Sequence, residues 1–343
     1  MQITGLSQAS DEQRWAFLTQ MFPGRREYLF RHWRWWYRAG FAPGIEPLAV
    51  IHDGEMIGQA GVIPVELQCG SQRLTAIWFL DFAVLPAYQG QGLGKRLTEA
   101  WMRMCGTQIT YCNDKSIRVF LKYGWKEKFD TARCAAPLKL ASVLRTRTEV
   151  PAVVKTGAFA LEPFYRLWLR GRCAGAPRLR PEPVKNNDAA LLAIYREGDR
   201  TTFGLVRDEA WIRWRILESP FVEEYQFFRH EKTAALVRAF CCEGIRRVHI
   251  LWIGGAAVAA QQAELMRGIA KWAIGQGAEL IWTTLNDPEL TKRAHSILPR
   301  QNKVRFAFFS SDPALSERFS KETFPLYAVD TDLDLDYVTD PVS

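Results

Sequence analysis

The chain has 343 residues, of which 48% are hydrophobic and 24% are charged, and its formal net charge is +8. No apolar run approaches the ~20 residues that a membrane-spanning helix needs, and residues 1–7 show neither the basic start nor the apolar stretch of a signal peptide. We therefore expect a globular cytoplasmic protein without a membrane span, divided into two domains of roughly 150 residues each.

Metal-binding, disulfide-rich and nucleic-acid-binding proteins are also disfavoured. The seven cysteines form an odd set without CxxC spacing or a nearby pair of histidines, so we predict reduced, mostly buried thiols and no metal site. The nearest feature to a nucleic-acid-binding stripe is the basic and aromatic run at residues 31–38, RHWRWWYR. Three tryptophans in an early helix usually anchor a core, and we therefore predict no nucleic-acid partner.

Residues 10–84 predict two short helices followed by strands. Apolar residues recur at three- and four-residue steps over residues 10–39, and Pro23-Gly24 interrupts this pattern. Asp53-Gly54 supplies the positive φ of a tight hairpin turn. The strands are expected at residues 47–52, 56–63, 65–68 and 75–84.

Helices and strands then alternate. The expected elements are a helix from Leu93 to about Gly106, a strand at Ile109–Cys112, a helix at Lys115–Tyr123 and a strand from Trp125 onward. Residues 146–183 break this pattern with five prolines and six arginines. We interpret them as a linker that carries one helix, Phe159–Arg170.

The second half repeats the first at low resolution. Arg213-Trp214-Arg215-Ile216 mirrors Arg34-Trp35-Trp36-Tyr37 at an offset of 179, and Asn286-Asp287 mirrors Asn113-Asp114 at an offset of 173. Both halves share the order helix, strands, helix, strand, Asn-Asp, helix, strand, although so few matches could also arise by chance. The predicted organisation is a domain at 1–145, a linker at 146–183 and a second copy at 184–343.

A glycine-rich turn, Gln89-Gly90-Gln91-Gly92-Leu93-Gly94, joins a predicted strand to a predicted helix. Glycines let the backbone approach a phosphate, while the unpaired amides and the dipole of the helix attract the anion. The spacing matches neither GxxxxGK[ST] nor the dinucleotide fingerprint GxGxxG. A tight turn into a packed helix, with no ligand, is the alternative.

At these residues the sequence resembles the GNAT superfamily of acetyltransferases, over about residues 45–135. Two motifs of this superfamily are present. The first is [Gln/Arg]-x-x-Gly-x-[Gly/Ala] after a Val-x-Pro turn. The second is an Asn followed by an aromatic residue and Gly-[Phe/Trp]. The matching residues are Gln89, Gly92 and Gly94 after Ala83-Val84-Leu85-Pro86, and Asn113, Phe120 and Gly124-Trp125. The tandem layout is similar to GNAT proteins of surface-polysaccharide gene clusters and, more distantly, to Fem-like aminoacyl transferases. The resemblance implies an α/β fold with a mixed sheet, in which two GNAT copies follow one another.

The resemblance also assigns acetyl-CoA contacts to residues. The backbone of Phe82, Ala83 and Val84 would pair with the pantetheine arm like an added strand. Asn113 would contact the pantetheine region, and Lys95 or Arg96 would add a cation near the phosphates, unless both are simply solvated. The amides that would hold the pyrophosphate belong to Gln89, Gly90, Gln91, Gly92, Leu93, Gly94 and Lys95.

One position departs from the family pattern, so the general acid of the reaction is left unassigned. Phe120 stands where many members have a tyrosine that protonates the departing thiolate, and a phenyl ring cannot donate a proton. Tyr123 lies on a different part of the same predicted helix. Asp81 is the only ionisable residue inside the strand before the turn, so we predict it as the base, with a structural acid that caps a loop amide as the alternative.

The second half lacks the phosphate-binding motif, because residues 252–257 read WIGGAA. We expect a degenerate copy that binds no CoA and forms one wall of the acceptor cleft. An acidic tail would suit a cationic amine, or would be a solvated terminus. It comprises Asp330, Asp332, Asp334 and Asp336, and it lacks the glycine and the glutamate of a calcium-binding loop.

The function implied is transfer of an acetyl group, or a longer acyl group, from acetyl-CoA to a primary amine. The run Tyr88–Lys95 resembles the loop of glucosamine-phosphate acetyltransferases, which favours an amino sugar or polysaccharide precursor as the acceptor. A module that binds CoA or a glycan without turnover is one alternative, and Phe120 favours it. A Fem-like aminoacyl transferase is the other, disfavoured by the intact loop.

Overall fold

The structure is a computed structural model that describes all residues except 141–151, 187–190, 193–194, 196–201, 256–257 and 333–343. The N-terminal half supplies the strands β1 (Gln2–Gly5), β2 (Leu48–His52), β3 (Glu55–Cys69), β4 (Gln72–Val84), β5 (Thr107–Cys112) and β6 (Lys126–Pro137). Its helices are α1 (Asp11–Met21), α2 (Arg26–Trp36), α3 (Leu93–Met102) and α4 (Ser116–Lys122). The elements predicted for this half are present, except that two predicted strands are one.

Local sequence explains where these elements begin and turn. Ser10 and Gln13 form a reciprocal capping box at the start of α1. Asp53 and Gly54 both have positive φ, as the tight turn between β2 and β3 requires. The expected pair of strands at 56–63 and 65–68 is wrong in one respect: they form a single strand, because Pro64 stays in the ladder opposite Ile77.

The C-terminal half supplies the strands β7 (Glu182–Pro183), β8 (Phe203–Leu205), β9 (Tyr225–His230), β10 (Thr233–Cys242), β11 (Ile245–Gly255), β12 (Leu280–Leu285) and β13 (Arg300–Ser310). Its helices are α6 (Ala152–Arg172), α8 (Glu209–Ile212), α9 (Ala259–Gly275), α10 (Pro288–Ala294) and α11 (Pro313–Lys321), and one π-helical turn, Arg213–Leu217, continues α8. The helix expected at 159–170 is therefore present and longer than predicted.

The two halves repeat the same supersecondary structure, as the sequence offsets indicate. β4 runs parallel to β5, and β11 runs parallel to β12. In the first pair the Thr110 hydroxyl donates to the carbonyl of Phe79 at 2.6 Å, and in the second the Thr283 hydroxyl donates to the carbonyl of Ile250 at 2.9 Å. Thr110 and Thr283 are 173 residues apart, the offset of the two Asn-Asp pairs. The repeat is therefore real and not a chance match.

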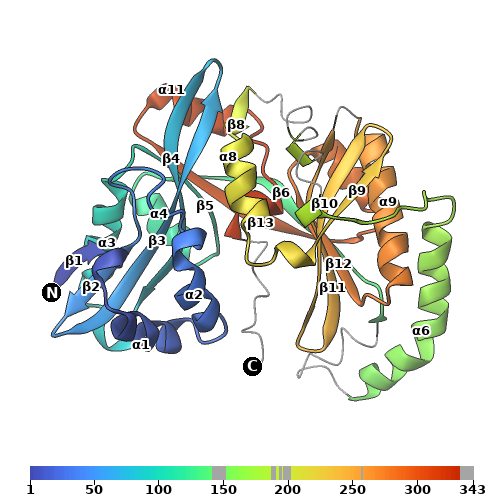
Figure 1. Ribbon diagram of the computed structural model, residues 1–343, viewed down its shortest axis with the longest axis horizontal. Helices are drawn as coiled ribbons and strands as arrows, with labels where there is room; N and C mark the ends of the chain where they lie inside the picture. Colours follow the sequence, from blue (N-terminus) through green and yellow to red (C-terminus); the bar gives the residue numbers. More distant parts are fainter. Residues whose placement is uncertain (141–151, 187–190, 193–194, 196–201, 256–257, 333–343) are drawn as a thin grey trace.

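The repeats exchange their last strands within one sheet (Figure 1). The described strands follow the order β1-β2-β3-β4-β5-β13-β6-β12-β11-β10-β9-β7, and β8 pairs with β3 outside this path. β13 thus lies between β5 and β6, while β6 lies between β13 and β12. Thr131 pairs with Val304, again 173 residues away, at the centre of this exchange. The proposed domains at 1–145 and 184–343 therefore share a continuous sheet.

Aromatic residues of α2 lie in the core of the N-terminal half. Trp33, Trp36 and Tyr37 are buried, which confirms the core reading of the run at residues 31–38. The C-terminal half has two further apolar clusters, and α6 lies at the outer margin of that half (Figure 1). Within the described residues no helix is both long enough and apolar enough to cross a bilayer.

Candidate functional site

An opening in the sheet separates the C-terminal ends of β4 and β5. These parallel strands pair only at Ile77 with Gln108 and at Trp78 with Ile109. Beyond this point β5 pairs with β13, so residues 79–84 of β4 keep backbone partners on the β3 side alone. An exposed strand edge of this kind can accept an extended ligand as an additional strand. The open edge of β4 contains Phe82, Ala83 and Val84, the residues that the family resemblance assigns to the pantetheine arm.

A β-bulge distorts β4 within this opening. Asp81 and Phe82 together face Ala60, between the pairs Gln59 with Ala83 and Gly61 with Leu80. Asp81 has a φ of 48°, a left-handed conformation that aspartate tolerates better than most residues. The bulge turns the Asp81 carboxylate into the protein and leaves the Phe82 side chain exposed.

The Asp81 carboxylate receives several donors inside the protein, where its side chain is only 5% exposed. Arg25 forms an ion pair with one oxygen, while the Trp36 indole N–H and the Tyr37 hydroxyl each donate to the other oxygen at 3.0 Å. Gly61 makes room for this arrangement, since a Cβ there would lie 2.8 Å from the Tyr37 ring. A carboxylate with so many donors is well placed to hold the bulge in shape, which favours a structural role for Asp81. These donors are side chains, whereas the structural alternative expected a loop amide.

The charges around Asp81 fix the protonation of its neighbours. Burial alone would lower the pKa of Arg25, but the Asp81 and Asp332 carboxylates raise it above its ordinary value. Burial raises the pKa of the Tyr37 hydroxyl well above its ordinary value, and the charge of Asp81 adds to this effect. Arg25 therefore stays charged and Tyr37 stays protonated at neutral pH.

The glycine-rich turn lies directly after β4 and is open to solvent. Gly90 and Gly92 have φ values of 78° and 76°, and a Cβ on either would meet no other atom within 4 Å. Gly92 is the N-cap of α3, whose first-turn amides have no partner within the helix. Open space and outward amides at a helix N-terminus fit the pyrophosphate of a CoA thioester.

The turn is braced by its own glutamine side chains. The Gln89 amide donates to the Val84 carbonyl at 2.8 Å, and the Gln91 amide donates to the Ala87 carbonyl at 3.0 Å. Lys95 lies 3.8 Å from Glu99 and is largely solvated, so it can reach toward a bound phosphate. Arg96 contacts the Met1 sulfur at 3.6 Å.

Asn113 lies in the turn before α4, at the opposite side of the opening. Its side-chain oxygen accepts from the amides of Lys115 and Ser116 at 2.9 and 3.0 Å. This capping hydrogen bonding explains part of the preference for asparagine at the position, independently of a cofactor. The contact with the pantetheine region that the resemblance assigns to Asn113 stays a prediction.

Phe120 is packed in an aromatic cluster beneath α4. Its ring stacks on Trp125 at a centroid distance of 4.8 Å and meets Phe79 edge-on at 5.7 Å. Phe79 in turn stacks on Trp101 of α3 at 4.0 Å. Phe120 therefore fixes α4 against α3 and β4, and Tyr123 lies past the C-terminal end of α4.

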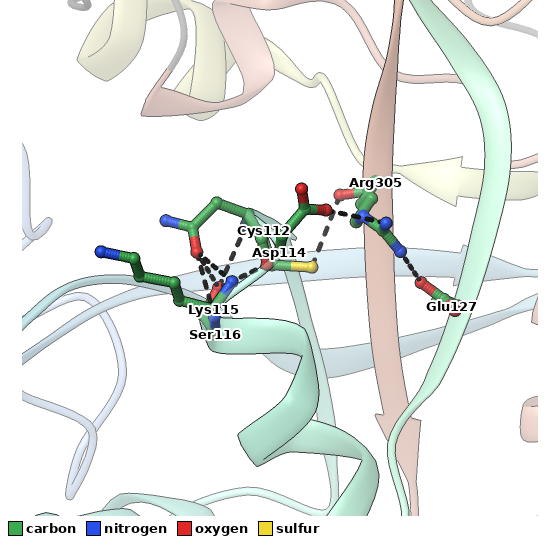
Figure 2. Close-up of polar contacts among 7 residues, drawn as sticks. Cys112, Asp114, Lys115, Ser116, Glu127 and Arg305 are labelled. Atoms are coloured by element: carbon green, nitrogen blue, oxygen red, sulfur yellow. Dashed lines mark hydrogen bonds and ion pairs between the residues drawn. The ribbon is translucent and has the colours of Figure 1, made fainter.

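A cavity of about 570 Å³ opens at the C-terminal end of β5. Figure 2 shows that Arg305, from the exchanged strand β13, bridges Asp114 and Glu127 of the N-terminal half, at 2.7 Å from each. The cavity thus takes charged groups from both halves. Its other lining residues include Tyr111, Cys112, Asn113, Ser116, Arg133, Asn302, Lys303 and Asp332.

Cys112 is unsuited to nucleophilic catalysis although it lines this cavity. Burial raises the pKa of its thiol to about 12, so the thiolate is scarce at neutral pH. The seven thiols are all free, and burial is confirmed for Cys134, Cys173 and Cys242, whereas Cys241 is exposed.

The acidic tail divides into parts with different roles. Asp330 is buried and makes a two-oxygen contact with Arg207, at 2.8 and 2.7 Å, so it is neither solvated nor available to an amine. Asp332 accepts from the Trp78 indole at 3.4 Å and borders the cavity. Asp334 and Asp336 lie outside the described residues. The tail therefore brings one carboxylate to the N-terminal site.

The C-terminal half has a shorter connection at the equivalent position. Eight residues (85–92) connect β4 to α3, whereas three (256–258) connect β11 to α9. Gly255 is enclosed, since a Cβ there would lie 2.1 Å from the Lys232 carbonyl. The lack of CoA binding by this half stays a prediction, which the short connection favours.

Sequence reasoning missed the partners of Asp81 and the convergence on the cavity. Trp36 and Tyr37 belong to the run at residues 31–38 that was assigned to the core, and no motif marks Arg25 or Arg305. The only available signal was the isolation of Asp81 in an apolar strand, which requires nearby donors. No cluster of three or more metal-ligating side chains occurs in the described parts of the chain.

Comparison with protein families identifies the N-terminal half. Residues 10–125 match the acetyltransferase (GNAT) family, so this chain carries a GNAT acyltransferase domain. No curated protein matches the sequence.

Solved structures extend the likeness of the fold to both halves. A GCN5-related N-acetyltransferase from Kribbella flavida is 16% identical, with a TM-score of 0.54, and the match covers 90% of this chain and 71% of that one. A probable N-acyltransferase from Enterococcus faecalis has 9% identity, a TM-score of 0.55 and coverages of 89% and 71%. N-myristoyltransferase from Saccharomyces cerevisiae, solved with bound myristoyl-CoA, has 9% identity, a TM-score of 0.60 and coverages of 90% and 82%. The chain has the tandem GNAT fold that the repeat indicates.

Proposed function

Since residues 10–125 form a GNAT acyltransferase domain, we propose that this protein transfers an acetyl group from acetyl-CoA to a primary amine. The observation that carries the proposal is the open edge of β4 beside the glycine-rich turn. The free edge suits the amides of a pantetheine arm, and the first-turn amides of α3 suit a pyrophosphate. GNAT domains use an acyl-CoA as co-substrate, and the intact turn makes acetyl-CoA the donor we propose.

The protein contributes mainly position and a preformed polar environment. In the reaction the amine nitrogen forms a bond to the thioester carbon while the carbon–sulfur bond breaks. Backbone amides beside the β4 bulge can polarise the carbonyl, and holding both reactants in one cleft supplies a large part of the acceleration. Phe120 offers no proton to the leaving sulfur. In this proposal water takes up the proton that the amine nitrogen loses, and water protonates the thiolate.

We place the amine acceptor in the cavity at the end of β5. Asp332 supplies a carboxylate that attracts an ammonium group, and Asn113, Ser116 and Asn302 supply the hydrogen-bonding groups that sugar hydroxyls require. Lys303 adds a cation at the cavity wall. An amino sugar or polysaccharide precursor combines the two kinds of group, an amine and several hydroxyls.

Asp81 has two possible roles, as the catalytic base or as a structural acid. As a base it would accept the amine proton directly or through water. As a structural acid it would keep the β4 bulge and Arg25 in place, which its several donors support. We favour the structural role.

We also propose that the protein acts in the cytoplasm, where acetyl-CoA is available and thiols stay reduced.

A screen of amines with acetyl-CoA, read by thiol release, tests the function. The expected result is turnover with amino sugars above the rate of acetyl-CoA hydrolysis. Binding of acetyl-CoA without turnover of any amine would instead favour the module that binds without catalysis, which Phe120 supports. Turnover only with aminoacyl donors would favour the Fem-like alternative.

A further inference from the structure

Helix α6 has apolar side chains on two opposite faces. Leu169 and, directly after the helix, Cys173 lie in the core of the C-terminal half, and the Tyr165 hydroxyl donates to the Pro137 carbonyl at 2.6 Å. These contacts fix the inner face of α6 against the protein. A surface helix normally presents polar side chains on the face opposite its core.

The outer face of α6 is apolar instead. Of twelve large apolar side chains that are exposed among the described residues, five belong to α6. Four share one stripe, because residues three, four or seven positions apart lie on the same face of a helix. They are Leu161, Phe164, Leu167 and Trp168, exposed by 58%, 73%, 69% and 43%. We call these four residues the outer stripe.

Helix α6 and the segment that follows it are basic. Residues 163–181 contain five arginines and no aspartate or glutamate. Arg170, Arg172, Arg178 and Arg180 are exposed, and the Arg172 guanidinium lies 4.8 Å from the centre of the Trp168 ring. The two flanking acids pair with other arginines, Glu162 with Arg166 and Glu182 with Arg229. The surface therefore combines exposed apolar side chains with an unbalanced positive charge.

We propose that α6 docks this protein on an anionic lipid bilayer, with the outer stripe inserted at the level of the headgroups. An apolar face of Leu, Phe and Trp flanked by arginines has the composition of helices that lie in the plane of a membrane surface. Tryptophan prefers this interface, and each arginine gains about 1 kcal/mol near an anionic surface. The helix lies along the surface and does not cross it.

The positive charge also argues against a second copy of the chain as the occupant. In a symmetric dimer the same patch is used on both copies, so the interface would collect the arginines of both without adding acids to balance them. Anionic headgroups neutralise the same charges. The charge of the patch thus selects a lipid partner over self-association.

Co-sedimentation of the full chain with vesicles tests this proposal. Vesicles of phosphatidylcholine alone are compared with vesicles that contain 30% phosphatidylglycerol, about the anionic fraction needed for a strong surface potential. We expect binding to the anionic vesicles only, with a partition coefficient that falls several-fold when salt rises from roughly 0.05 to 0.5 M. A shift of tryptophan emission to shorter wavelength on binding, lost in Trp168→Phe, would place Trp168 in the bilayer.

Three variants separate the contributions of apolar side chains and of charge to membrane binding. Leu167→Glu should lower the partition coefficient at least tenfold, and Arg170→Glu with Arg172→Glu should lower it roughly tenfold. The control is Leu121→Glu, which introduces the same charge at a 49% exposed leucine of α4 and should bind as the unaltered protein does. Equal melting temperatures of all variants exclude unfolding as the cause of lost binding.

Several results would overturn the proposal. Binding to neutral and anionic vesicles alike, binding that survives both α6 variants, or no binding to any vesicle would each do so. A dimer in sedimentation equilibrium that dissociates in Leu167→Glu, without vesicle binding, would assign the outer stripe to a second copy instead. None of these outcomes depends on the acetyltransferase reaction.

Discussion

Trp35 and Trp214 exchange hydrogen bonds across the two halves of the protein. The Trp35 indole donates to the Trp214 carbonyl at 2.7 Å, and the Trp214 indole donates to the Trp35 carbonyl at 2.8 Å. The two residues occupy equivalent positions of the internal repeat. The contact therefore joins α2 to the π-helical turn after α8, and the two tryptophans are related by a local two-fold axis. The exchanged strands β6 and β13 show the same two-fold relationship within the sheet.

This reciprocity predicts coupling between the two tryptophans. Trp35→Phe and Trp214→Phe should each lower the free energy of unfolding by about 1–2 kcal/mol, because each leaves a carbonyl without its donor. The double variant should lose less than the sum, with a coupling energy of roughly 0.5 kcal/mol or more. Urea unfolding of the four proteins measures this cycle. Strict additivity would show that the two hydrogen bonds act independently.

Asp81→Asn separates the two roles of that carboxylate. Because the substitution removes the charge that pairs with Arg25, we expect unfolding free energy to fall by about 2–4 kcal/mol, while the folded protein keeps most of its kcat/KM. A base would instead give a loss of roughly 100-fold in kcat/KM and remove the acidic limb of the pH–rate profile. Asp53→Asn is the matched control, since Asp53 also has a positive φ but is exposed. A large loss of rate at unchanged stability would contradict the structural role.

Phe120→Tyr tests the departure from the family pattern. The ring packs against Trp125 and Phe79, so a hydroxyl there either faces the opening or is buried without a partner at a cost of about 1–3 kcal/mol. We expect activity to stay unchanged or to rise modestly, since a tyrosine could protonate the thiolate. Tyr123→Phe should leave the rate unchanged. A tenfold loss in Tyr123→Phe would identify Tyr123 as the acid.

The burial of His249 leads us to expect that the folded protein loses stability at acidic pH. Burial lowers the pKa of this imidazole well below its ordinary 6.5, and the charges of Arg133 and Arg238 add to the effect. The unfolded chain therefore binds a proton that the folded chain does not, and stability falls by up to about 1.4 kcal/mol per pH unit as pH drops below 6.5. His249→Phe should flatten this slope, whereas the exposed His295→Phe should not. Denaturant unfolding at pH 5, 6 and 7 provides the comparison.

The sequence predicts local features well because their causes are local. Apolar spacing places the helices and strands, and Asp53-Gly54 places the hairpin turn. The strand exchange is not predictable in this way, since β6 and β13 carry the same alternating pattern whichever strand they pair with. The surroundings of Asp81 depend on Arg25 and Asp332, which are more than 300 residues apart in the chain. Asp330 looked like part of a solvated acidic tail, and only the fold reveals the buried Arg207 that pairs with it.

Calorimetric titration with acetyl-CoA tests the central proposal most directly. We expect one site per chain, on the N-terminal half, and a loss of binding in Gly92→Val, where a side chain would enter the phosphate approach and strain a φ of 76°. Gly244→Val is the matched control, because Gly244 has a φ of 71° and a Cβ there also meets no atom within 4 Å. It should show the same backbone strain and bind acetyl-CoA as the unaltered protein does. Two equivalent sites, no site, or unaltered binding by Gly92→Val would contradict the assignment of the glycine-rich turn.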